Sequence, residues 1–557
     1  MKLNGAGIIV ECLKEQGVDT IFGFPGGAVL NTYDALYKNK EFIRHILTAH
    51  EQGASHAADG YARATGKVGV VFATSGPGAT NLVTGLATAY MDSIPVVAFT
   101  GNVSTTLLGR DSFQEVDITG ITMPITKHNY IVKDVDRLAD TIREAFHIAQ
   151  EGRPGPVLID VPKDVSAAMA EYVPMERKSF SPSFEAVKPS AIEKTIRLLK
   201  ESTRPMLYVG GGVIRSSAQK ELAEFIEKID SPMGVSLMGN GAVYSDNPRF
   251  TGMIGMHGTR VSNIAVNNCD LLLVVGARFS DRVVSKASAF ARNAKVIQID
   301  VDPAEINKNI STFHHVIGDV KVVLSILNSK ITEPLEHSAW MEQIALWKRE
   351  YPVKISGETR RPREILQALS QVLPRTAVIV TEVGQHQMWA AQFYNHSPEG
   401  RFLTSGGLGT MGYGTGAAMG AQFGCPDRRV VNVAGDGSFR MNCNELATIA
   451  RYRIPLVILV MNNHTLGMVR QWQTLFYEQR YSETTLDTDI NWVKLADAYG
   501  VHGMYLSEND DPAAVLSAAI ALNAPVVVDC EIPLDNMVYP MVAPGASIDD
   551  MIEETND

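Results

Sequence analysis

The chain of 557 residues has a net charge of −11 and 45% apolar residues, a composition typical of a globular protein with roughly three or four domains. The acidic balance argues against a nucleic-acid-binding protein. No apolar run approaches the roughly 20 residues that a membrane span needs, and charged residues interrupt the N-terminal stretch where a signal peptide has its apolar core. The five cysteines are scattered, which predicts neither disulfides nor a zinc site. We therefore expect a cytoplasmic protein that binds neither nucleic acid nor membrane.

The first region, residues 1–173, alternates amphipathic helices with short apolar strands at 68–73, 95–100 and 156–161. This rhythm is typical of a parallel α/β sheet. Residues 171–190 contain three prolines and several serines, so they are interpreted as a linker.

The second region, residues 190–331, shows the same rhythm, with strands expected at 206–209, 271–275 and 296–300. Residues 332–362 are charged and are interpreted as a second connection. The third region spans residues 363–540, and the acidic tail after it is expected to be loose.

Polar residues follow two apolar runs in the third region. The run 430–434 ends at Gly435-Asp436-Gly437-Ser438, and the run 454–461 ends at Asn462-Asn463. Glycines let a phosphate approach backbone N–H groups, and Asp436 and Asn463 are hard oxygen donors suited to magnesium. The alternative is two ordinary strand-ending turns. The Asn pair at the end of the second run favours a magnesium–phosphate site.

The first and third regions resemble each other in sequence. Residues 69–81 parallel 430–442, and residues 155–162 parallel 524–533. Between these, residues 93–102 parallel 453–463, so the order is preserved. This predicts a duplication with two sheets of one topology. The alternative is the chance similarity of any two parallel-sheet regions.

The G-D-G-S motif and the later Asn-Asn pair resemble the diphosphate motif of thiamine-diphosphate enzymes. The resemblance covers nearly the whole chain and is closest to the large catalytic subunits of biosynthetic acetohydroxyacid (acetolactate) synthases. It implies an α/β fold of three doubly wound parallel-sheet domains: pyrimidine-binding (1–173), central FAD-binding (190–331) and diphosphate- and Mg²⁺-binding (363–540). The implied cofactors are thiamine diphosphate, Mg²⁺ and FAD.

The resemblance also implies which residues hold thiamine diphosphate. The carbonyl of Thr465 joins Asp436 and Asn463 as a metal ligand. Met411 is the wedge that keeps the cofactor bent, a role that suits a flexible, polarizable side chain, and the Gly409 carbonyl accepts from the aminopyrimidine. The remaining residues implied at this cofactor are Val383, Gly384, Gln385, His386, Gly435, Gly437, Ser438 and Met468.

Residues 49–54 match the family segment that carries the activating acid. By resemblance, the carboxyl group of Glu51 hydrogen-bonds the pyrimidine ring and favours the imino tautomer that removes the thiazolium proton. The alternative is an ordinary glutamate on a helix surface, and only the motif favours the catalytic role. The presence of Glu51 argues against glyoxylate carboligase, a relative that lacks this acid.

Other matches lie on the substrate side. The resemblance places Gly27, in a glycine-rich loop, over the thiazolium ring, and Gln114 and Lys127 along the channel. Arg282 pairs with the carboxylate of the second 2-ketoacid. Trp472 shapes the acceptor pocket and indicates the biosynthetic type. The chain departs from the family pattern at positions without a proton-transfer group, which leaves channel shape and inhibitor sensitivity open: Asn102, Ser104, Arg110, Ser112 and Ser280.

A glycine triplet after a strand in the central region favours a dinucleotide phosphate, although the G-x-G-x-x-G pattern is missing. The resemblance implies a structural FAD that undergoes no net redox change. The alternative is a nucleotide fold without a ligand. The residues implied at FAD are Arg153, Gly210, Gly211, Gly212, Leu237, Met238, Met256, His257, Gly276, Arg278, Asp300 and Asp319.

The expected reaction is a carboligation at the first common step of branched-chain amino-acid biosynthesis. Two pyruvates give 2-acetolactate and CO₂, and pyruvate with 2-ketobutyrate gives 2-aceto-2-hydroxybutyrate. The alternatives are a flavin-dependent pyruvate oxidase with the same three domains and a non-catalytic subunit that only binds thiamine diphosphate. The resemblance further implies a homodimer or a dimer of dimers, with Glu51 of one chain facing Asp436 of another, and a small regulatory subunit.

Overall fold

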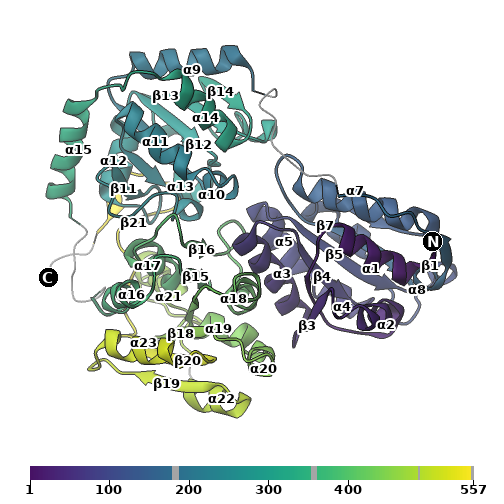
Figure 1. The fold of residues 1–557 in the computed structure, drawn as a ribbon. Helices are drawn as coiled ribbons and strands as arrows, with labels where there is room; N and C mark the ends of the chain where they lie inside the picture. The colour runs from purple at the N-terminus through teal and green to yellow at the C-terminus, as the bar shows by residue number, and fades with distance from the viewer. Residues whose placement is uncertain (178–186, 353–359, 487–489, 554–557) are drawn as a thin grey trace.

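The computed structural model describes residues 1–177, 187–352, 360–486 and 490–553. Within these residues, three six-stranded parallel sheets form three domains around a common centre (Figure 1). Each sheet is buried between two apolar clusters, as expected for strands that are continuous apolar runs. The predicted fold class, α/β with doubly wound parallel sheets, is confirmed.

Parallel strands form the sheet of the N-terminal domain. In chain order they are β2 (Thr20–Gly23), β3 (Arg44–Leu47), β4 (Gly69–Ala73), β5 (Val96–Asn102), β6 (His128–Ile131) and β7 (Val157–Pro162). The longer helices around this sheet are α1 (Gly5–Glu15), α2 (Leu30–Lys38), α3 (Glu51–Thr65), α5 (Val83–Asp92) and α7 (Leu138–Gln150). Shorter elements complete the domain: β1 (Lys2–Asn4), α4 (Pro77–Thr80), α6 (Ile118–Thr122), α8 (Lys163–Ala167) and β8 (Met169–Glu171).

The central domain has its own parallel sheet. Its strands are β9 (Pro205–Val209), β10 (Met233–Val235), β11 (Phe250–Met253), β12 (Leu271–Val275), β13 (Lys295–Asp300) and β14 (His314–Ile317). Its helices are α9 (Pro189–Glu201), α10 (Gly211–Arg215), α11 (Gln219–Ile229), α12 (Arg260–Asn268), α13 (Asp281–Val284), α14 (Val320–Lys330) and α15 (Ser338–Glu350).

The C-terminal domain repeats the pattern. Its strands are β15 (Val378–Thr381), β16 (Arg401–Leu403), β17 (Val430–Gly435), β18 (Val457–Asn462), β19 (His502–Leu506) and β20 (Val526–Glu531). Its helices are α16 (Arg360–Val372), α17 (Gln385–Phe393), α18 (Tyr413–Gly424), α19 (Asp436–Asn442), α20 (Leu446–Arg451), α21 (Gly467–Phe476), α22 (Trp492–Tyr499) and α23 (Pro512–Ala521).

The strand orders show which domains are alike. The N-terminal sheet runs β3-β2-β4-β5-β7-β6 and the C-terminal sheet runs β16-β15-β17-β18-β20-β19. Numbered within each domain, both orders are the same, so the prediction of two sheets with one topology is confirmed. The central sheet runs β11-β10-β9-β12-β13-β14, which is the strand order of dinucleotide-binding α/β domains.

One predicted connection contains a helix. Residues 332–362 were expected only to link two domains, but α15 lies within them, and residues 353–359 lie outside the described part of the chain. Trp340 and Ile344 of α15 are buried in the central domain, and Trp340 Nε1 donates to the Pro205 carbonyl oxygen at 2.9 Å. The apolar residues at helical spacing outweigh the charged residues between them. In the linker predicted at 171–190, residues 178–186 also lie outside the described part.

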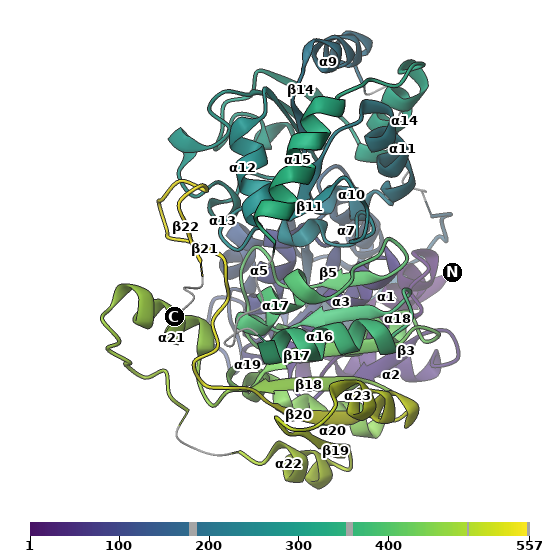
Figure 2. The ribbon, with the colours of Figure 1, turned by 90° about the vertical axis from the view of Figure 1, so that its left-hand side faces the viewer.

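The expectation of a loose tail is wrong for residues 541–553. Strands β21 (Met541–Val542) and β22 (Met551–Ile552) form an antiparallel pair against the central domain (Figure 2). Ile548 is buried in the central apolar cluster, and Asp549 accepts a hydrogen bond from Asn267 Nδ2 at 2.6 Å. A few apolar anchors in an acidic segment are enough to dock it. Residues 554–557 lie outside the described part.

Helices α3 and α18 join the N-terminal and C-terminal domains, and they lie next to each other in Figure 1. Their backbones approach so closely that a Cβ atom on Gly420 would overlap the carbonyl oxygen of Ala57. A Cβ on Gly60 would similarly overlap the Ala417 carbonyl oxygen. Glycine is therefore required at these positions because of the contact between domains.

In the described part of the chain, no helix is long and apolar enough to cross a membrane.

We expect Gly420→Ala to destabilise the protein by about 1–3 kcal/mol, because overpacking forces the backbones of α3 and α18 apart. Gly7→Ala in α1 is the matched control, since its Cβ would meet only side-chain atoms and alanine favours helix. The measurement is the midpoint of thermal unfolding of each variant. An unchanged midpoint for Gly420→Ala would show that the two helices separate without cost.

Candidate active site

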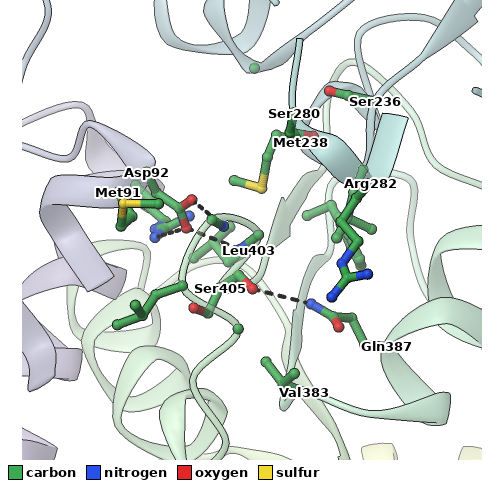
Figure 3. Close-up of a pocket in the computed structure, with 18 of the residues that line it drawn as sticks. Met91, Asp92, Ser236, Met238, Ser280, Arg282, Val383, Gln387, Leu403 and Ser405 are labelled. Carbon is green, nitrogen blue, oxygen red and sulfur yellow. Dashed lines mark hydrogen bonds and ion pairs between the residues drawn. The ribbon is translucent and has the colours of Figure 1, made fainter. Parts of the chain in front are cut away.

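A large cavity of about 1510 Å³ lies where the three domains meet. Figure 3 shows its walls: Met91 and Asp92 come from the N-terminal domain, Met238 and Arg282 from the central domain, and Val383 and Ser405 from the C-terminal domain. Its volume exceeds that of a usual single-ligand pocket, which spans about 300–1,000 Å³. The cavity therefore has room for more than one ligand.

Two strand ends place oxygen donors side by side in this cavity. Strands β17 and β18 are adjacent and parallel, with Gly435 opposite Met461. Asp436, Asn463 and Thr465 follow these strands, and all three line the cavity. Burial raises the pKa of Asp436 to about 6, and no lysine or arginine among the described residues forms an ion pair with it. A buried carboxylate without a protein cation, beside amide and carbonyl oxygens, suits a hard divalent cation.

The turn from β15 to α17 closes the other side of this donor set. Gly384 has φ of 154°, and His386 packs against both Gly384 and Gly435. Burial lowers the pKa of His386 to about 3, so its ring is neutral. Within the described residues His386 Nε2 has no hydrogen-bond partner, which leaves it available to a ligand. Gln385 Nε2 is fixed by the Asn536 carbonyl oxygen at 2.7 Å.

A loop before α18 brings Met411 to the cavity wall. Gly409 and Gly412 both have positive φ, 70° and 84°, which favours glycine at each. Asn442 Nδ2 donates to the Gly412 carbonyl oxygen at 2.7 Å, and Thr410 Oγ1 pairs with Thr88 Oγ1 at 2.7 Å. The loop is therefore held by α19 of its own domain and by α5 of the N-terminal domain.

The sequence analysis missed Glu382. Its buried carboxylate accepts hydrogen bonds from the Thr415 backbone N–H at 2.9 Å and from Ser438 Oγ at 3.1 Å. Burial raises the pKa of Glu382. The contacts tie the end of β15 to the starts of α18 and α19, so Glu382 positions the segments that carry Met411 and Asp436. Its only sequence signal was a carboxylate directly after an apolar run, a pattern also typical of turns.

Glu51 lies outside the cavity of its own chain. It begins α3, is 8% exposed, and accepts from Asn81 Nδ2 at 2.9 Å. Gly78 packs close to the Glu51 carboxylate, and Gly76 packs against the backbone of Gln114. The N-terminal domain therefore brings Glu51 and Gln114 together at the end of β4.

Two further predicted channel residues also lie outside this cavity. Gly27 belongs to the short helical turn Gly27–Val29, next to Ala28, whose N–H donates to Thr74 Oγ1 at 3.4 Å. Lys127 Nζ donates to the carbonyl oxygens of Ile148 and Glu151 at the end of α7. In this chain Lys127 is a helix C-terminal cap, which the sequence could not show because the end of α7 lies 20 or more residues away along the chain.

The predicted acceptor residues are brought together. The Arg282 guanidinium lies 5.8 Å from the centre of the Trp472 ring, and Arg282 Nη1 lies 3.7 Å from Met256 Sδ. All three side chains line the cavity. The nearest carboxylate in an ion pair with Arg282 is that of Asp281, at 3.9 Å and 81% exposed, so Arg282 is available to an anionic ligand.

The cavity also contains most of the residues predicted for FAD. Eleven of the twelve line it, and Gly210 does not. A Cβ on Gly210 would overlap the Gly276 carbonyl oxygen, and Gly212 packs on Gly276 as well. These two glycines serve the contact between α10 and the turn after β12, and Gly211 and Gly212 line the cavity. Asp300 ends β13, and burial raises its pKa to about 6.

Two sheets of one topology, a dinucleotide-type sheet between them, and oxygen donors beside a glycine cradle define a thiamine-pyrophosphate enzyme. Three family models agree: the N-terminal TPP binding domain matches residues 3–121, the central domain 192–327, and the C-terminal TPP binding domain 382–530.

Individual relatives show to which group of thiamine-pyrophosphate enzymes the chain belongs. The acetolactate synthase large subunit of Cyanidium caldarium is 45% identical over 99% of this chain and 96% of its own length. The isozyme 2 large subunit of Escherichia coli (strain K12) is 45% identical over 99% and 100%. The probable large subunit of Methanocaldococcus jannaschii is 45% identical over 99% and 95%. The chain belongs to the family of acetolactate synthase large subunits.

Proposed function

We propose that this chain is the catalytic subunit of an acetolactate synthase. It acts on pyruvate as donor and on pyruvate or 2-ketobutyrate as acceptor, and gives 2-acetolactate or 2-aceto-2-hydroxybutyrate. The observation that carries the proposal is one cavity lined by the donors Asp436 and Asn463 and by the acceptor pair Arg282 and Trp472. A site that only decarboxylates pyruvate needs no group to bind the carboxylate of a second ketoacid, whereas a carboligase needs such a group.

Several residues of the cavity would hold thiamine diphosphate. When bound, thiamine diphosphate supplies the electron sink that lets pyruvate lose CO₂. Asp436, Asn463 and the Thr465 carbonyl would hold Mg²⁺ and through it the diphosphate, with His386 Nε2 as a further polar contact. Met411 would support the bent cofactor.

The acceptor is recognised by two groups. The Arg282 guanidinium would pair with its carboxylate through two parallel hydrogen bonds. Trp472 would offer an apolar face to the alkyl group. Both acceptors have the carboxylate that Arg282 would contact, so Arg282 would not distinguish between them. Discrimination between pyruvate and 2-ketobutyrate would therefore depend on Trp472.

The central domain would hold FAD as a structural cofactor. Its strand order, the cavity-lining Gly211 and the buried Asp300 at the end of β13 fit a dinucleotide.

The active unit is at least a homodimer. Glu51 and Gln114 lie outside the cavity that contains Asp436 in the same chain, so Glu51 of one chain would serve the cofactor held by the other. The side chain next to Gln114, Phe113, is 88% exposed and offers an apolar surface to the partner. The relatives are named large subunits, which supports a small regulatory subunit as a further partner.

Product identity tests the proposal directly. The purified chain, supplied with pyruvate, Mg²⁺, thiamine diphosphate and FAD, should release one CO₂ for each 2-acetolactate without a change in the flavin spectrum. Acetate or acetyl phosphate together with flavin bleaching would identify a pyruvate oxidase. Cofactor binding without turnover would identify a non-catalytic subunit.

Mixed dimers test the shared site. Glu51→Gln should lower turnover by about 10²–10⁴-fold, as loss of a proton-transfer group does, while Asp436→Ala should abolish Mg²⁺-dependent cofactor binding. Mixing the two inactive proteins under subunit exchange should restore part of the activity, because one site in the mixed dimer is intact. Each variant incubated alone is the control. If exchange is demonstrated and activity stays absent, the site is built within one chain.

Trp472→Leu should lower the preference for 2-ketobutyrate over pyruvate by about ten-fold, because one methylene in an apolar pocket contributes about 1–3 kcal/mol. Formation of 2-acetolactate should persist. Arg282→Ala is the comparison, since it should weaken both reactions together. The measurement is the ratio of the two products with both ketoacids present, and an unchanged ratio for Trp472→Leu would assign acceptor choice to another surface.

A further inference from the structure

Several arginines meet where the N-terminal and central domains face the cavity. Arg63 pairs with Asp59 at 2.6 Å and with Asp92 at 2.8 Å. Arg153 pairs with Glu305 at 2.8 Å. These guanidinium groups already have protein carboxylates as partners.

Arg215 is different. Nη1 of its guanidinium donates to the carbonyl oxygen of Ser93 at 3.1 Å, and among the described residues no carboxylate lies within ion-pair distance of it. The Arg215 side chain is exposed at the cavity wall, where the charges of Arg63, Arg278 and Arg153 repel it and that of Asp92 attracts it. Arg215 therefore lines the cavity without a carboxylate in ion-pair contact among the described residues, and a bound anion would stabilise its charge.

The fold places Arg215 at a defined point of the central sheet. The chain passes from β9 to β10 and β11 on one side and then returns to β12 on the other side of β9. The crevice between β9 and β12 is thus the point where the strand order reverses, which is where α/β sheets bind a dinucleotide phosphate. α10 follows β9 here and ends at Arg215, and Arg215 Nη2 lies 3.5 Å from the Cβ position of Gly211. The guanidinium therefore folds back over Gly211, a cavity-lining glycine of the triplet.

We infer that Arg215 is an anion-binding residue of the dinucleotide site and pairs with the diphosphate of FAD over Gly211. The inference rests on the proposed binding of FAD to the central domain. A planar guanidinium, with Nη1 held by Ser93 and Nη2 over Gly211, matches phosphate oxygens better than an ammonium group does. The hydrogen bond to Ser93 holds the side chain in place, so the phosphate-binding group also links the central domain to the N-terminal domain.

The test is a titration of the flavin-free full-length protein with FAD, followed by flavin fluorescence, with thiamine diphosphate and Mg²⁺ present. Arg215→Gln should raise the Kd for FAD by about ten-fold or more, the usual effect of losing a charged hydrogen bond, and Arg215→Lys should raise it less. The affinity for thiamine diphosphate should stay the same. Arg197→Gln on α9 is the matched control, because Arg197 is 67% exposed and does not line the cavity.

Competition with ADP and with adenosine tests whether Arg215 recognises the charged diphosphate or the adenosine part of the ligand. If Arg215 contacts the diphosphate, Arg215→Gln raises the inhibition constant of ADP, calculated with the variant's own Kd for FAD, and leaves the inhibition constant of adenosine unchanged. Equal weakening for both competitors, or an unchanged Kd for FAD, would overturn the inference. Failure of the unsubstituted protein to bind FAD would overturn the proposed cofactor itself, and the two failures are therefore distinguishable.

Discussion

The direct backbone contact between α3 and α18 fixes the position of the two thiamine-binding domains in one chain. Gly416 lies against Gly53, and Gly420 lies against Ala57, four residues later on each helix, so the two helices run in the same direction. Each helix begins at a functional segment: α3 at Glu51 and α18 just after Met411. Glu445 strengthens this end of the contact, because its carboxylate accepts from the N–H groups of Ala49 and His50, both at 3.0 Å. The C-terminal domain thus holds the start of the helix that carries Glu51, the proposed activating acid.

A buried charge network lies farther along the same helices. Arg63 of α3 pairs with Asp59 and Asp92, and Asp92 accepts from the backbone N–H groups of Gly406 and Gly407 in the loop before α18. Burying charges costs desolvation energy, and an apolar cluster could replace such a network without loss of stability. We interpret its role as orientation: the hydrogen bonds fix one conformation of the loop that ends at Met411, which apolar contacts alone would leave less defined.

Much of the fold, and the meeting of Asp436 and Asn463 in one cavity, could be predicted because both depend on local patterns. Buried parallel strands are continuous apolar runs, and adjacent parallel strands end at one edge of the sheet, so the residues after β17 and β18 had to meet. The features that could not be predicted depend on contacts between segments that lie far apart in the sequence. Lys127 caps α7 because the end of that helix lies beside it across the domain. Arg215 follows a glycine triplet and resembles an ordinary surface arginine, and only the strand order shows that it faces the cavity. In α15 and in residues 541–553, the many charged residues obscured the few apolar residues that dock these segments on the central domain.

The arrangement divides the chemical groups of the site between two places in each chain. The cavity contains the groups proposed to bind metal, diphosphate and acceptor, whereas Glu51 lies at the end of β4 with Gln114 nearby. The residue before Gln114 is apolar and open to solvent: Phe113 is 88% exposed. Exposed apolar side chains of this kind favour association with another protein surface. Association here would cover Phe113 near Glu51, where the activating acid is proposed to act. With the proposed shared site, chemistry and assembly would be coupled by mass action, and an isolated chain would bind cofactor but lack the group proposed to activate it.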